Sequence, residues 1–252
     1  MTRDGVTLHA KHALMPNNLG YCGPDENGKI LEHLHGSSTS ESLLSTLKEF
    51  EAAYPFIRMI ARSTGRNPFD YEVTEAYWIG NRLLELVEPA QFYDFAHRGP
   101  ASHLTREAAK TIFREVGTSA KPHHTFYVLG MYGRSNGSPS GEKKLLELMD
   151  SCRISWGKVV GVRERTLLVE RSPLALVDDR LSLAKPVEKE VAYDKGISPF
   201  EGIRAGDWVS LHWNFACEKL KQYQLRNLRE YTAVDIDATN RFVRSREWKR
   251  QS

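Results

Sequence analysis

The chain has 252 residues, of which 40% are hydrophobic and 27% are charged, and its formal net charge is +3. A chain of this size can bury one large core or two small ones, and its charge is too small to indicate a nucleic-acid partner. No stretch approaches the roughly 18 consecutive apolar residues of a membrane-spanning helix, so we expect no contact with a membrane.

The three cysteines, Cys22, Cys152 and Cys217, lie far apart along the chain. An odd number of distant cysteines without a CxxC pair argues against a disulfide framework and against a zinc ribbon. The first residues include histidine, lysine and asparagine where a signal peptide would have its apolar stretch. We therefore expect a cytoplasmic protein with reduced thiols.

The first half of the chain is predicted to be mainly helical. A helix should begin near Ser40 and break or restart at Pro55, and its apolar side chains recur at helical spacing. Further helices are expected over 71–87 and 104–116, and the last of these should end at Gly117. The apolar stretch 121–133 is too short to assign to a strand or a helix from its periodicity.

The second half is predicted to be a small barrel. The stretch Gly133 to Gly141, "GRSNGSPSG", is the clearest linker, and a short helix follows it. Apolar alternation then predicts strands at short intervals within 153–220, and a closing helix over 221–240 whose Leu225, Leu228, Tyr231 and Ile236 could pack onto the barrel. The expected fold class is α+β, with a helical domain over 1–141 and a small antiparallel β-barrel over 142–252 that includes a basic tail.

Two stretches of the second half resemble a known family. "CRISWGKVVGV" begins at Cys152, and "GDWVSLHWNFACEKL" includes His212. Their order and spacing are similar to those of the small hydrogenase-maturation chaperones of the HypC/HupF/HybG type. In these proteins a cysteine precedes a Gly-Lys/Arg-Val-Val strand, and a later Gly-Asp-Trp/Tyr-Val strand includes a histidine. The resemblance covers about residues 152–235.

This resemblance implies a HypC-like, OB-like barrel and a role in the maturation of nickel-iron hydrogenase. It implies that Cys152 is a thiolate ligand of iron and that His212 is an imidazole ligand or its hydrogen-bond partner. Thiolate is the metal-binding form of cysteine, and a nearby metal ion favours that form. The implied partners are other maturation proteins or the hydrogenase large subunit.

The first half contains further candidate ligands. Cys22 lies in a turn-rich stretch, "NNLGYCGP", that could present it at a cleft, and His33 follows in "EHLHG". His123 and His124 are adjacent in "PHH". One cysteine with two or three histidines could hold iron or zinc, although these residues show no recognised metal-site spacing.

Over its whole length the chain resembles a bacterial family of uncharacterised proteins. The shared motifs are found here at 17–24, 76–81 and 122–124, together with the same C-terminal module. Three interpretations follow. The first is an accessory protein that binds or transfers an iron unit through Cys152 and His212. The second is a cysteine- or metal-dependent enzyme centred on Cys22, with the barrel as a docking module. The third is a metal-free protein-binding scaffold.

Overall fold

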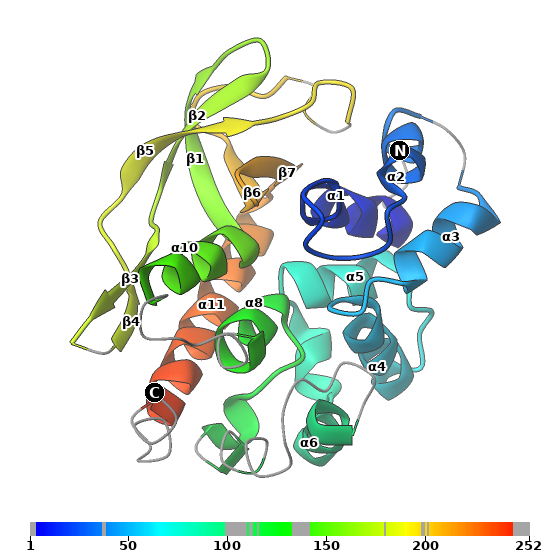
Figure 1. The fold of residues 1–252 in the computed structure, drawn as a ribbon, viewed down its shortest axis with the longest axis vertical. Coiled ribbons are helices and arrows are strands. Elements are labelled where there is room, and N and C mark those ends of the chain that lie inside the picture. The colour runs from blue at the N-terminus through cyan, green and yellow to red at the C-terminus, as the bar shows by residue number, and fades with distance from the viewer. Residues whose placement is uncertain are drawn as a thin grey trace.

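In the computed structural model, the chain is described over residues 4–36, 39–98, 110, 113–114, 116–132, 142–178, 180–197, 200 and 202–243. The N-terminal helices lie beside a closed β-barrel, and the C-terminal helix runs along both of them (Figure 1). The expected α+β class, with N-terminal helices, a barrel and a closing helix, is confirmed. Within the part of the chain that is described, no helix is both long and apolar enough to cross a membrane.

Seven helical elements lie within the described residues before position 99. They are α1 (Gly5–Asn18), α2 (Asn27–Leu34), α3 (Glu41–Lys48), α4 (Tyr54–Thr64), α5 (Tyr71–Trp78), η1 (Arg82–Leu86) and α6 (Pro89–Arg98). The Ser40 side chain accepts a hydrogen bond from the Leu43 N–H at the start of α3, and Pro55 lies in the first turn of α4. The predicted break at Pro55 is therefore confirmed.

The helix expected over 71–87 is shorter than predicted. Helix α5 ends at Trp78 because Gly80 has a left-handed backbone, with φ of +92°, which turns the chain out of the helix. A Cβ atom at Gly80 would lie 2.3 Å from the Tyr231 ring of the C-terminal helix. Glycine is thus needed both for the turn and for this close approach.

The apolar stretch 121–133, which periodicity could not assign to a strand or a helix, is helical and buried over most of its described residues. It forms α8 (His124–Phe126) and the π-helical turn η3 (Tyr127–Tyr132), after a short η2 (Gly117–Ser119). Most of the helix expected over 104–116, the linker Gly133 to Gly141 and the basic tail lie outside the described residues. Helix α10 (Glu142–Cys152) then leads into the barrel.

The barrel has five strands in the order β1-β2-β5-β7-β6. The strands are β1 (Ser155–Val162), β2 (Thr166–Arg171), β5 (Val187–Ala192), β7 (Phe215–Lys219) and β6 (Trp208–His212). All neighbouring pairs are antiparallel except β5 and β7, which pair parallel, so the predicted antiparallel barrel is a mixed one. An odd number of strands cannot alternate in direction around a closed ring, so one pair has to be parallel. Strands β3 (Leu174–Val177) and β4 (Arg180–Leu183) form a separate hairpin.

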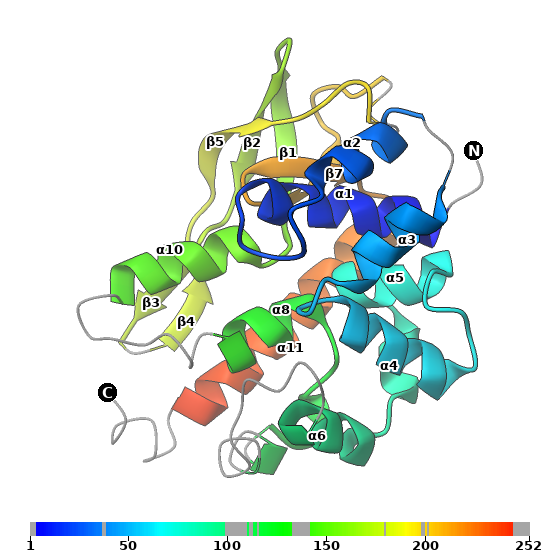
Figure 2. The same ribbon diagram turned by 45° about the vertical axis from the view of Figure 1, so that its right-hand side comes forward.

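The C-terminal helix α11 (Gln222–Val243) contacts more than the barrel. Leu225 and Leu228 are buried in the same large core as the N-terminal helices, and the Tyr231 hydroxyl donates to the Asn81 carbonyl. The interior of the barrel forms a second, smaller core. Figure 2 shows α1 lying across the barrel beside β7, so that helices from the start of the chain cover the end of the barrel. The predicted domain boundary near residue 141 stays a prediction.

Candidate metal centre

A small cavity lies where the N-terminal helices meet the barrel. Its volume is about 80 Å³, enough for a metal ion with one or two small ligands. Its polar side chains include those of Cys22, His124, Cys152 and His212. The remainder of the lining is mainly apolar or aromatic and includes Ala13, Pro16, Phe50, Ala52, Ala53, Trp78, Tyr127 and Leu148.

Three of these polar residues form a compact group. His124 is the first residue of α8, Cys152 is the last residue of α10, and His212 is the last residue of β6. One ligand atom from each lies within 4.8 Å of the other two, and His124 Nε2 is 4.0 Å from Cys152 Sγ. Metal bonds to nitrogen and sulfur are roughly 2.0–2.3 Å long, so a small inward shift of these side chains would enclose an ion.

The tautomer of His212 is set by helix α1. His212 Nδ1 lies 2.6 Å from the main-chain oxygen of His12, and a carbonyl oxygen can only accept a hydrogen bond. The proton is therefore on Nδ1, and the lone pair is on Nε2. That Nε2 atom is buried and has no hydrogen-bond partner among the described residues. This is the arrangement expected of a metal-binding imidazole oriented by a carbonyl.

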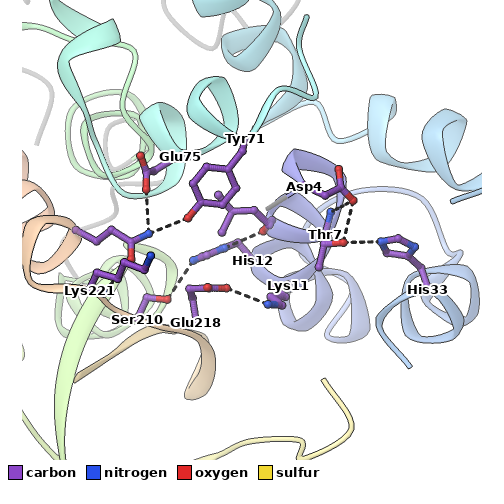
Figure 3. Close-up of polar contacts among 12 residues, drawn as sticks. Asp4, Thr7, Lys11, His12, His33, Tyr71, Glu75, Ser210, Glu218 and Lys221 are labelled. Carbon is purple, nitrogen blue, oxygen red and sulfur yellow. Dashed lines mark hydrogen bonds and ion pairs between the residues drawn. The ribbon is translucent and has the colours of Figure 1, made fainter. Parts of the chain in front are cut away.

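Helix α1 is itself fixed to the barrel by polar contacts. His12 Nδ1 donates to the Leu8 carbonyl at 2.9 Å, and His12 Nε2 accepts from the Ser210 hydroxyl at 3.2 Å. Lys11 forms an ion pair of 3.0 Å with Glu218 of β7, and both of these residues are largely buried (Figure 3). The carbonyl that orients His212 is thus held at a fixed distance from the barrel.

His124 has an oxygen atom within hydrogen-bond distance of each ring nitrogen. The Tyr77 hydroxyl donates to the Ala52 carbonyl, so its oxygen is available to accept from His124 Nδ1 at 2.9 Å. His124 Nε2 lies 2.9 Å from the carbonyl oxygen of Cys152, which can also accept a hydrogen bond. The neutral ring has one proton and donates to one of these two oxygens, and only the tautomer with its proton on Nδ1 leaves Nε2 free for a metal ion. In that tautomer, two imidazole nitrogens with free lone pairs and a carbonyl oxygen lie beside the Cys152 sulfur. A cation among them would satisfy all four.

Burial determines the charge of these groups. It lowers the pKa of His212 to about 4, against the opposing effect of the His12 and Cys152 carbonyls, and it lowers the pKa of His124 well below the ordinary value. Both imidazoles are therefore neutral, which is the form that binds metals. Burial, assisted by the Cys22 thiol, raises the pKa of Cys152 to about 12. The indole of Trp213 lies close enough to Cys152 to offset part of this rise in pKa.

Cys22 lies on the loop between α1 and α2. The Asn17 side chain donates to the Cys22 and Pro24 carbonyls, and Gly23 has φ of +82° with its Cα packed against the Phe50 ring. These contacts hold Cys22 at the wall of the cavity, next to the three-residue group. Burial raises the pKa of the Cys22 thiol. The loop therefore places a second thiol at the wall of the same cavity.

Two of the candidate ligands lie elsewhere. His33 on α2 donates from Nε2 to the Thr7 hydroxyl at 3.0 Å, because the Thr7 proton is given to Asp4 (Figure 3). His123 is fully buried and pairs through Nδ1 with Asp235 of α11 at 2.6 Å. The structure does not place either imidazole in the cavity. Of the six candidate ligands, it brings together Cys22, His124, Cys152 and His212.

Several residues that support the site are not among the six candidate ligands. Trp78 is buried, its ring stacks on His12 at 5.3 Å, and it lies 4.7 Å from the ring of His124. Tyr77 and Trp78 belong to the Ala-Tyr-Trp motif at 76–78, which was the available signal. His12 gave no signal that separated it from other histidines, because its role depends on a contact 200 residues away.

The fold and the site define a helical and barrel protein with a buried cluster of two histidines and one cysteine. The chain belongs to DUF6390, a family of unknown function, whose model matches residues 1–246. The expectation of an uncharacterised family is thus confirmed. No curated protein and no solved structure matches the chain.

Proposed function

We propose that the protein binds one transition-metal ion through His124, Cys152 and His212, and that it handles an iron centre during maturation of nickel-iron hydrogenase. The main support for the metal site is that three ligand atoms lie within 4.8 Å of one another in a buried cavity. Cys152 and His212 are also the residues that match the hydrogenase-maturation chaperones. His124 from the N-terminal half would complete a site formed by both halves of the chain.

The donor set favours some metals over others. Thiolate and imidazole together suit iron, zinc, nickel or copper, whereas magnesium and calcium prefer oxygen ligands. No carboxylate is among the described residues that line the cavity. The assignment to iron, and to maturation proteins or the hydrogenase large subunit as partners, rests on the resemblance of the C-terminal module.

The first experiment is metal analysis of protein purified without oxygen, combined with Mössbauer and infrared spectra. We expect about one metal ion per chain in the wild type. Cys152→Ser, His124→Gln and His212→Gln should each lower the metal affinity by at least about 100-fold, since each removes one of three ligands. Infrared bands of cyanide and carbonyl ligands that disappear in Cys152→Ser would support the role in hydrogenase maturation.

The matched control is His33→Gln, which removes an imidazole that lies outside the cavity. Its amide can still donate to the Thr7 hydroxyl, so we expect wild-type metal content and wild-type stability. Retention of the metal in Cys152→Ser would contradict the proposed site. Absence of metal from every preparation, even with hydrogenase proteins co-expressed, would leave the metal-free scaffold as the better interpretation.

A second candidate function is a metal-dependent enzyme that uses the same cavity. The observation that favours it is the number of ligands, because catalytic metal sites keep three protein ligands and one open position. Cys22 lies at the wall of that open space. Turnover by the purified protein without any partner, lost in Cys22→Ala, would favour the enzyme over the accessory protein.

A further inference from the structure

Two aromatic rings lie between the cavity and the solvent. Tyr21 directly precedes Cys22, and Trp213 directly follows His212. The two rings stack with centroids 4.1 Å apart and planes inclined by 17°, and both side chains line the cavity. Tyr21 has an exposed fraction of 57%, so one side of this stack faces the solvent and the other faces the metal ligands.

The backbone holds Trp213 in an unusual conformation. Trp213 and Asn214 form the two-residue turn between β6 and β7, with φ of +51° and +58°. Both positions of such a turn favour glycine, asparagine or aspartate, and a bulky residue with positive φ is uncommon. The Trp213 N–H donates to the Ser151 carbonyl at 2.8 Å, which ties the turn to the end of α10 beside Cys152. A large ring kept here against the backbone preference suggests that the ring itself has a use.

The indole N–H of Trp213 adds a second observation. It is buried and forms no hydrogen bond with a described residue, although it lies near the Cys152 side chain. Cys152 Sγ lies in the same cavity, and a metal-bound thiolate is a stronger acceptor than a thiol. When a metal binds, the cavity would therefore supply the partner that the indole lacks.

We propose that the Tyr21–Trp213 stack is a gate over the metal cavity, and that an indole hydrogen bond to the metal-bound Cys152 sulfur holds this gate closed. This inference rests on the proposed metal site. Tyr21 limits access, and Trp213 is a positioning residue that couples the gate to the occupied site. Entry and release of the ion then require the two rings to separate, while the ligands keep their places on α8, α10 and β6.

The gate can be tested without any metal. In the metal-free protein, the rate of alkylation of Cys152 by iodoacetamide reports access to the cavity, and mass spectrometry assigns the modified cysteine. Tyr21→Ala should raise this rate by about tenfold, and Tyr21→Phe, which keeps the ring, should leave it unchanged. Cys217, which is fully buried in the core, serves as the internal reference for global opening. Equal rates in Tyr21→Ala and Tyr21→Phe would overturn the gate.

The coupling to the metal is tested with Co²⁺, whose thiolate charge-transfer band reports on the Cys152 sulfur. Trp213→Phe keeps a ring to stack on Tyr21 but removes the N–H. We expect it to shift this band and to speed loss of Co²⁺ to a chelator by about tenfold, whereas Tyr21→Ala should speed loss without shifting the band. An unshifted band in Trp213→Phe would overturn the indole contact. Wild-type protein that binds no Co²⁺ would contradict the proposed metal site, and the alkylation rates would still decide whether the gate exists.

Discussion

Protonation at single side chains determines what the cavity can bind. The neutral imidazole of His212 has a free lone pair on Nε2 because its Nδ1 donates to the His12 carbonyl. The neutral imidazole of His124 has a free Nε2 lone pair in the tautomer whose Nδ1 donates to Tyr77. Cys152 differs, because burial raises its pKa to about 12 and its thiol is protonated at neutral pH. A metal ion that binds here must therefore displace one proton from Cys152 and none from the histidines.

This leads to a prediction for the pH dependence of metal binding. If Cys152 is the sole thiolate ligand, the apparent dissociation constant should fall about tenfold for each unit of rising pH between about pH 6 and about pH 8. A twofold steeper logarithmic slope would show that Cys22 is deprotonated as well and is a fourth ligand. Isothermal titration in buffers that do not bind metal measures this slope. A dissociation constant that does not change with pH would be incompatible with thiolate ligation.

At the scale of elements, the ligands lie at helix and strand ends that other contacts fix in place. The end of α10 is held by Asp150, which accepts from Arg153, from Arg171 of β2 and from the Leu174 N–H. The side chains of Arg153 and Arg171 are 1% and 4% exposed. Two buried guanidinium groups thus depend on one carboxylate, and Cys152 lies between Asp150 and Arg153 in sequence.

We expect Asp150→Asn to lower the free energy of unfolding by about 3–5 kcal/mol, because it leaves two buried positive charges without a counterion. The matched control is Asp237→Asn on α11, whose ion pair with Arg241 is exposed and should contribute less than about 0.5 kcal/mol. Urea unfolding followed by circular dichroism measures both variants. Similar losses in the two proteins would show that the Asp150 cluster does not stabilise the fold.

At the scale of the whole molecule, α1 lies at the centre of the structure. It is buried on almost all sides, between the other helices and the barrel (Figures 1 and 2). Burial lowers the pKa of His9 to about 4 and that of His12 to about 3. Each ring is satisfied in its neutral form, since His9 accepts from the Trp78 indole and donates to the Leu47 carbonyl.

These buried histidines predict that the fold is sensitive to mild acid. Below the ordinary pKa of about 6.5, the unfolded chain binds protons that the folded chain cannot, so stability falls as the pH falls. Each such histidine should contribute a loss of about 1.4 kcal/mol per pH unit between about pH 6.5 and about pH 5. Urea unfolding at several pH values tests this, and His9→Gln, whose amide can replace both ring contacts, should make the dependence less steep. Equal stability across this range would contradict the prediction.

The sequence predicts the barrel better than the helical half. Strand alternation and glycine turns are local signals, and they place strands throughout the barrel. They do not separate β6 from β7, and they do not predict the parallel pair that closing the ring requires. Helix α1 has no polar face, so its periodicity gave no signal. The pairing of Cys152 with His212 came from the family resemblance. His124 could be named as a candidate, but its choice over His123 depends on how α8 turns against α5, which the sequence does not encode locally.

The contact between His12 and His212 has a consequence for the stage of synthesis at which the protein becomes able to bind a metal ion. A ribosome adds these two residues at opposite ends of synthesis, and His124 and Cys152 emerge between them. A nascent chain therefore exposes only part of the donor set until the β6–β7 hairpin has been made and has docked against α1. Metal binding would then occur only after folding is complete, and a chain whose synthesis stops before β6 would not bind the ion.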